Sequence, residues 1–322
     1  MTYNKVLIKF ILLLFIPIIS TAQVSGPRWY VKAAAGFGSK GFLPTGHSPK
    51  ALMPSNSSFD IADGTIVDMT NSVDSIKQKS YVHDTYTKGF NYYLGAGYKL
   101  SKYWGVELGV LWLQGGNITS RQVMDTNPLL GPGAIMDIKT YVRGLAVIPS
   151  LTLDIPLNDK WFIQAHAGLT LPVYGKIYHR ADIDAQHTFV GPLKAILIAE
   201  TQASFALGVN GGIGVHRKLG KRVEVFVDLI AQHLNVSAKH MDITQYDITI
   251  QGNTVDQIAA NPGAYHSQIN FINELNAQSN NKLNNPNTDE SKPKDELVTA
   301  APFSNMGIGF GLLFKLGKLS EE

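Results

Sequence analysis

Apolar and polar residues alternate strictly along eight segments of this chain, which is the period of a β-strand with two different faces. One face of every segment carries no charge; in the last segment it holds Met306, Ile308, Phe310 and Leu312. The eight predicted strands cover residues 29–37, 92–100, 104–112, 145–155, 161–173, 203–215, 223–231 and 306–316.

Glycine and charge gather on the opposite face of these segments. Gly307, Gly309 and Gly311 lie there in the last segment, although glycine packs nothing and weakens an ordinary strand. The charged residues of this face are Lys32, Lys99, Glu107, Asp154, Glu224, Asp228 and Lys315. A face of glycines and ions cannot form the core of a soluble barrel, so the apolar face is predicted to point outward, into lipid.

The connections between the predicted strands alternate between short and long. Three are short, at residues 101–103, 156–160 and 216–222, and the long ones cover about 40–91, 113–144, 174–202 and 232–305. Lipid offers no hydrogen bonds, so strands cross it only as a closed barrel. The fold class predicted is all-β, an eight-stranded antiparallel transmembrane β-barrel with short periplasmic turns and long extracellular loops.

The four tryptophans all fall on the apolar face, where a bilayer interface selects an aromatic girdle. Trp29, Trp104 and Trp161 lie beside the short-turn end and Trp112 lies at the opposite end.

Three local features complicate this pattern. Pro149 lies inside the fourth strand, where it removes a ladder hydrogen bond, so a bulge or a later strand start near Leu151 is expected. Residues 241–251 also alternate and could pair above the membrane, which would raise the strand count to ten. Tyr265, Ile269, Ile272 and Leu275 have helical spacing and predict a short helix over the barrel mouth, followed by a flexible Asn-rich stretch at 276–294.

The first residues predict export. Residues 1–22 combine two lysines, an apolar run and a small-residue end, which is typical of a cleaved signal peptide, and 23–322 are predicted to form one barrel domain. Cleavage leaves 26 basic and 25 acidic residues, a charge that does not suggest nucleic-acid binding. The chain has no cysteine, and no later apolar run approaches the length of a membrane helix.

The leader and the eight amphipathic strands resemble the small OmpA/OmpX-like outer-membrane β-barrel family. The resemblance implies a bacterial outer-membrane location, contact with outer-membrane lipid, and a last strand that the barrel-assembly machinery reads during biogenesis. The pattern of that signal fits Asn305, Gly307, Phe310 and Leu312, although this chain continues for ten residues beyond Leu312. No peptidoglycan-binding domain follows, and a monomer is expected.

Inward charges are the first candidates for chemistry. Lys32, Glu107, His166, Glu224 and Asp228 are predicted to form a polar network in a lumen just wide enough for side chains to fill. A filled, ion-paired lumen without an open pore is expected; the alternative is a proton or ion path, which would make the protein a narrow channel.

The outer rim could instead hold an enzyme site, since some small barrels process lipid or peptide there. Its histidines are His179, His187, His233 and His240, but no serine is marked as a nucleophile. Asp182 and Asp184 match no calcium loop. The sequence therefore predicts a non-enzymatic structural or surface-binding protein with no catalytic residue, cofactor or metal, and an unknown extracellular ligand held by its long loops.

Overall fold

The computed structural model describes residues 28–40, 66–67, 79–80, 85–124, 134–187, 191–282, 284–298 and 300–317. The predicted signal peptide and most of the predicted loop 40–91 lie outside these ranges. In the described part of the chain, no helix has the length and apolar character needed to cross a membrane.

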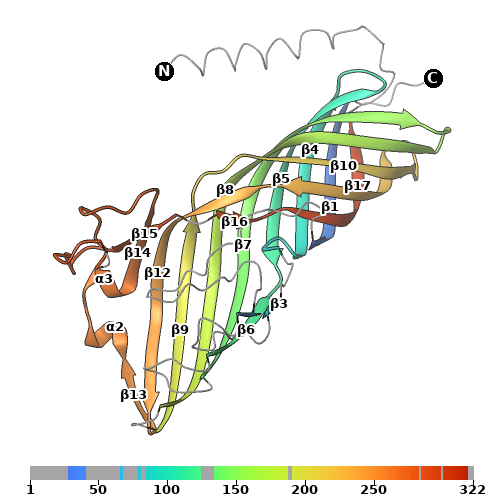
Figure 1. The fold of residues 1–322 in the computed structure, drawn as a ribbon. Coiled ribbons are helices and arrows are strands. Elements are labelled where there is room, and N and C mark those ends of the chain that lie inside the picture. The colour runs from blue at the N-terminus through green and yellow to red at the C-terminus, as the bar shows by residue number, and fades with distance from the viewer. Residues whose placement is uncertain are drawn as a thin grey trace.

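Eight strands pair side by side in a closed ring, and each covers most of one predicted segment. The blue β1 and the red β17 close it, because β17 pairs with both β1 and β11 (Figure 1). In ring order the strands are β1 (Trp29–Lys40), β4 (Gly89–Lys99), β5 (Trp104–Gly115), β7 (Ala134–Pro156), β8 (Trp161–His187), β10 (Gly208–Lys218), β11 (Val223–His233) and β17 (Asn305–Leu316). Every pair is antiparallel, and β10 begins five residues later than its predicted segment.

The register of the ring is staggered. A path of directly paired residues that starts at Tyr30 returns to β1 at Lys40, a displacement of ten residues around eight strands. The path runs through Gly97, Glu107, Ser150, Gly168, Asn210, Gln232 and Asn305. Such a shear tilts the strands by about 40° and leaves an interior about as wide as the side chains that fill it.

Side chains close two of the short turns. Ser101 Oγ accepts hydrogen bonds from the backbone nitrogens of Tyr103 and Trp104. Asn158 Oδ1 accepts from those of Lys160 and Trp161. In both turns a side-chain oxygen binds backbone nitrogens two and three residues further along, which stabilises a tight turn.

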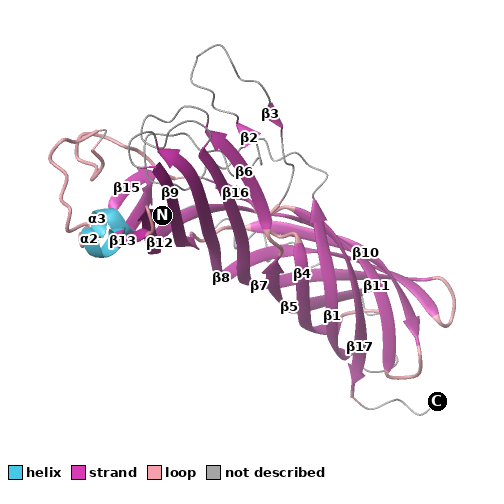
Figure 2. Ribbon diagram, turned by 90° about the horizontal axis from the view of Figure 1, so that it is seen from below, coloured by secondary structure: helices cyan, strands magenta, loops and turns pink. Residues whose placement is uncertain are grey.

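All four of the segments predicted as long loops contain strands. β7 and β8 are 23 and 27 residues long and continue past the ring into a curved sheet, which we call the extension (Figures 1 and 2). Its order is β15-β14-β12-β9-β8-β7-β6. The added strands are β6 (Ile118–Met124), β9 (Gly191–Ala203), β12 (Asn235–Ile250), β14 (Gln268–Ile272) and β15 (Lys294–Leu297). β13 (Asn253–Asp256) and β16 (Ala300–Pro302) pair with β12, and β2 (Ile66–Val67) pairs with β3 (Lys79–Ser80).

The alternation noted at 241–251 belongs to β12, which pairs with β9 beyond the ring and therefore adds no strand to it. The predicted helix over 265–275 is wrong. Only α2 (Gln257–Ala260) and α3 (Ala264–Ser267) are helical here, and Ile269 and Ile272 lie on β14, which pairs with β12. Sheet pairing has overridden a helical spacing. The stretch predicted as flexible contains a hydrogen-bonded turn network, in which the Asn280 side chain donates to three carbonyls, those of Asp289, Lys292 and Pro293.

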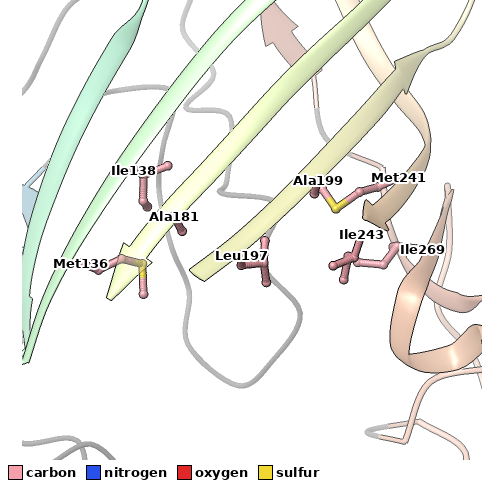
Figure 3. Packing of buried hydrophobic residues seen from close by; sticks show 8 residues of the cluster. All are labelled: Met136, Ile138, Ala181, Leu197, Ala199, Met241, Ile243 and Ile269. Carbon is pink, nitrogen blue, oxygen red and sulfur yellow. The ribbon is translucent and has the colours of Figure 1, made fainter. Parts of the chain in front are cut away.

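The extension has an apolar inner face. Its buried cluster crosses β7, β8, β9, β12 and β14 and consists of Met136, Ile138, Ala181, Leu197, Ala199, Met241, Ile243 and Ile269 (Figure 3). Burial of this face stabilises the extension as a folded sheet.

Pro149 does not end its strand. It pairs with Leu108 on β5, while the β7–β8 ladder is interrupted at Ile148 and Pro149. The bulge lies further out and on β8: Leu145 pairs with Tyr174 and Ala146 with Pro172, so that Val173 is the extra residue. The expectation of a bulge at Pro149 itself was thus wrong in position and in strand.

Candidate functional site

The lumen holds an ion pair at its centre. Lys32 Nζ lies 2.8 Å from Asp228 Oδ2 and 3.3 Å from Gln164 Oε1, and both charged groups are buried. The ammonium also lies 4.4 Å from the centre of the Phe226 ring. His216 stacks between Phe162 and Phe226, with Nε2 at 3.4 Å from Asp228 Oδ1. Removal of either partner would leave the other charge buried and unpaired, which is strongly destabilising.

Glu107 lies apart from that pair. Its Oε1 accepts a hydrogen bond of 2.5 Å from the Tyr93 hydroxyl, and its Oε2 has no hydrogen-bond partner among the described residues. Arg28, just before β1, donates a hydrogen bond to the Tyr98 hydroxyl at the exposed turn end and does not reach Glu107. The three inward lysines each pair with another carboxylate, so among the described residues Glu107 has no basic partner.

Two further ion pairs lie nearer the short turns. Lys315 Nζ is 2.6 Å from Glu224 Oε1, and Lys99 Nζ is 2.5 Å from Asp154 Oδ2. Of the five predicted lumen residues, Lys32 and Asp228 form an ion pair and line one cavity together with Glu107 and His166, whereas Glu224 pairs with Lys315 nearer the short turns.

A cavity of about 60 Å³ lies inside the ring, lined by Glu107, Tyr93, His166 and Asn210 among others. His166 Nδ1 and Asn210 Oδ1 are buried without hydrogen-bond partners among the described residues. The space is large enough for a few water molecules.

Sequence reasoning missed the inward tyrosines. Tyr30 and Tyr93 cross the lumen, and a Cβ on Gly97 or Gly109 would overlap the ring of Tyr30 or Tyr93. The signal was present, since each tyrosine shares the parity of inward residues and a glycine lies opposite or near it.

The predicted girdle tryptophans all lie on the outer face of the ring. Trp29, Trp104, Trp112 and Trp161 are 59 %, 41 %, 57 % and 38 % exposed. Trp29 packs edge-on against Tyr98, with ring centroids 4.9 Å apart. At the other end Trp112 pairs with Tyr92, close to the contact between Phe37 and Phe90, three aromatic residues that the prediction did not include.

The predicted assembly signal lies on the closing strand β17. Phe310 and Leu312 point outward, Asn305 is buried, and Gly307 lies against the Phe37 carbonyl. These are the positions of the residues in the folded strand. Recognition of the strand by the barrel-assembly machinery stays a prediction.

The rim histidines do not form a triad among the described residues. His179 is buried between the hydroxyls of Thr140 and Thr201, and burial lowers its pKa to about 4. His233 Nδ1 lies 2.9 Å from Ser304 Oγ without a carboxylate, whereas His240 contacts Asp242 and Asn270 without a serine. His187 ends β8, and nothing is described of its side chain.

Asp182 and Asp184 belong to ion pairs rather than to a metal cage. Asp182 binds Arg180 through two nitrogens, and Asp184 lies 3.5 Å from Lys194. No group of three or more metal-ligating side chains occurs among the described residues.

The outer face of β7 and β8 changes character at one level. In the ring the outward residues are apolar up to Leu145 and Val173. Just beyond, Arg143 pairs with Lys176 outward while the inner face takes the apolar residues, among them Val142 and Ile177. This inversion is the change expected where a sheet leaves lipid and enters water.

A closed ring with an apolar outside and a polar, ion-paired inside is the architecture of a membrane β-barrel. The chain belongs to the outer membrane protein beta-barrel domain family, whose model matches residues 10–257, and is thereby assigned to the bacterial outer membrane.

Similar solved structures include Neisserial surface protein A, at 10 % identity over 89 % of this chain and 97 % of that one, with a TM-score of 0.35. Ail, the attachment invasion locus protein of Yersinia pestis, has 10 % identity, coverages of 90 % and 100 %, and a TM-score of 0.26. The Ralstonia pickettii toluene transporter TbuX has 11 % identity, coverages of 92 % and 90 %, and a TM-score of 0.23. No curated protein matches the sequence.

Proposed function

We propose that this chain is a closed, non-enzymatic eight-stranded barrel that displays its extension at the cell surface, where the extension binds a partner or braces the envelope. The observation that carries the proposal is the continuation of β7 and β8 beyond the apolar band, into a sheet with an apolar core of its own. A rigid sheet of this size above a barrel provides a large surface for binding.

A deletion tests the role of the extension. Ser237 on β12 pairs with Ala300 on β16, so residues 239–298 can be replaced by a two-residue Gly-Ser turn without separating the strands at the base. The ring strands remain whole, and retained heat-modifiable migration on gels will show that the barrel still folds.

Cells that display the full chain are compared with cells that display the deletion. We expect the deletion to lower attachment to polystyrene, or to raise sensitivity to dodecyl sulfate, at equal surface abundance. A matched control deletes only the short-turn residues Leu219 and Gly220 at the opposite end. If attachment and detergent sensitivity both stay unchanged, the proposal is wrong.

The channel alternative has less support, because Lys32, Asp228 and the inward tyrosines occupy the lumen. In planar bilayers we expect the purified protein to give no conductance steps. The enzyme alternative has one favourable contact, between Ser304 and His233, but Ser304 is buried, and within the described ranges no carboxylate orients the histidine. Ser304→Ala is expected to leave the envelope lipids unchanged.

A further inference from the structure

The strongest unassigned feature is a set of six residues on the outer face of β7 and β8, directly beyond the apolar band. They form three cross-strand pairs: Arg143 with Lys176, Tyr141 with Tyr178, and Lys139 with Arg180. We call this set the cationic ladder. We propose that the cationic ladder binds the phosphate groups of an outer-leaflet lipid.

Two stacked tyrosine rings of the ladder hold the Arg143 guanidinium in a fixed position. The rings of Tyr141 and Tyr178 stack with centroids 4.8 Å apart and planes 11° from parallel. The Arg143 guanidinium carbon lies 5.7 Å from one centroid and 5.8 Å from the other, within cation–π range of both. The guanidinium is exposed and keeps its hydrogen-bond donors free for a planar, bidentate anion contact.

The charges of the ladder are only partly neutralised by protein. Lys176 pairs with Glu200 at 2.7 Å, and Arg180 pairs with Asp182. Neither Arg143 nor Lys139 forms an ion pair with a carboxylate in the part of the chain that the structure describes. Two like-charged pairs face each other directly across the strands, which destabilises a sheet unless an anion lies between them.

The order of charges along the sheet agrees with a membrane ligand. The pair beyond the ladder is Asp137 with Asp182, followed by Ile135 with Asp184. On β7 and β8 the basic residues thus lie next to the apolar band and the acidic residues lie farthest from it, whereas the neighbouring β9 places Glu200 opposite Tyr178 and Lys194 opposite Asp184.

The height of the ladder fits the headgroup layer. Trp161 to Val173 extends for about 40 Å along β8, which at the tilt of about 40° is about 31 Å along the membrane normal, close to the thickness of a bilayer's hydrocarbon core. Arg143 lies two residues beyond Leu145, so its head group reaches about 5 Å past the hydrocarbon, where lipid phosphates lie. To reach the cationic ladder, a soluble protein partner would have to penetrate the layer of lipid headgroups.

Binding is tested in detergent with lipid A as the probe, by native mass spectrometry of the full chain. Wild-type protein is expected to retain lipid A, to bind dephosphorylated lipid A far more weakly, and to keep lipid A in the presence of millimolar inorganic phosphate. The double variant R143Q/K176Q should weaken lipid A binding by about 25-fold, since each basic side chain near an anionic surface contributes about fivefold.

K194Q is the matched control, because Lys194 is an exposed lysine of the same extension outside the ladder. It should change lipid A binding by less than twofold. Heat-modifiable migration will show that each variant folds, and K139Q/R143Q replaces the double variant if that one does not fold. Unchanged binding by the ladder variants, equal weakening by K194Q, or equal affinity for dephosphorylated lipid A would each overturn the proposal.

The placement of this site in the outer leaflet rests on the proposed orientation of the barrel. Binding in detergent does not depend on orientation, so failure of one proposal can be told from failure of the other.

Discussion

The glycines of the inward face have a steric role that differs from one position to the next. Gly109 lies beneath the ring of Tyr93, which bonds to Glu107, whereas the nearest atom to a Cβ on Gly309 would be Ile230 Cδ1 at 3.4 Å. Crowding by Tyr93 therefore explains why a strand can carry bulk on its lipid face and a bare backbone inside.

We predict that Gly109→Ala destabilises the barrel by about 1–3 kcal/mol, the usual cost of overpacking a filled interior. Gly309→Ala, at another inward glycine, should change the unfolding free energy by less than about 0.5 kcal/mol. Urea unfolding in lipid vesicles, followed by tryptophan fluorescence, measures both. Equal destabilisation by the two variants would refute the steric explanation.

His179 makes the extension sensitive to acid. Burial lowers the pKa of this histidine to about 4, below its ordinary value near 6.5, because the charged form loses its water. Between these two values the unfolded chain binds the proton and the folded chain does not. The stability from neutral His179 is thus complete above about pH 6.5 and is lost as the pH falls toward 4.

The loss should reach about 3 kcal/mol, the free-energy equivalent of that pKa difference. It is measured by urea unfolding at pH 7 and pH 4.5, with a dye on a cysteine at position 194 reporting on the extension. The His179→Leu variant is the reference, since it lacks this titration and keeps every other one. An equal pH dependence in both proteins would contradict the prediction.

At the scale of elements, the ring was predictable and the extension was not. The eight ring strands can be recognised in the sequence because large apolar residues facing lipid alternate with glycine and polar residues facing the lumen. β7 beyond Leu145 still alternates, but its apolar residues change face between Val142 and Leu145, so the pattern breaks where one strand continues. The buried face of the extension also contains polar residues, His179 on β8 and Thr201 on β9. In the sequence such residues are typical of a polar loop, so they hide the strand pattern.

Pairing partners within the lumen were also beyond sequence reasoning. The inward parity of Lys32, Glu107, Glu224 and Asp228 follows from alternation alone. Which of them meet depends on the ten-residue shear of the ring, which no local pattern specifies. Hence the Lys32–Asp228 contact and the isolation of Glu107 required the structure.

The bulge at Val173 sets which face of the extension is apolar. Without this extra residue, every side chain of β8 beyond it would move to the other face. In the intact protein a cysteine at exposed position 180 should react with maleimide, and one at buried position 181 should not. Deleting Val173 should expose position 181, whereas Val173→Ala, which keeps the residue count, should leave the labelling pattern unchanged. Protection of position 181 after the deletion would refute this role.

At the scale of the whole molecule, the fold is one sheet used in two solvents. In the ring the apolar side faces outward and the ions face inward, and in the extension the two exchange places. β7 and β8 carry this exchange within single strands, so they fix where the membrane ends, between Leu145 and Arg143 on β7. The same level places the aromatic contacts of Trp112, Tyr92, Phe37 and Phe90 at the end of the band that faces the extension.

The absence of cysteine from the sequence allows a direct test of which end faces outward. A single cysteine at Lys194 in the extension should react with a membrane-impermeant maleimide on intact cells. One at Asn158, in a short turn at the other end, should react only after the envelope is opened. The physical reason is that short turns belong to the periplasmic side of these barrels and the longer segments to the outside. If Asn158→Cys were labelled on intact cells and Lys194→Cys were protected, the barrel would be inverted, and the cationic ladder would face the inner leaflet.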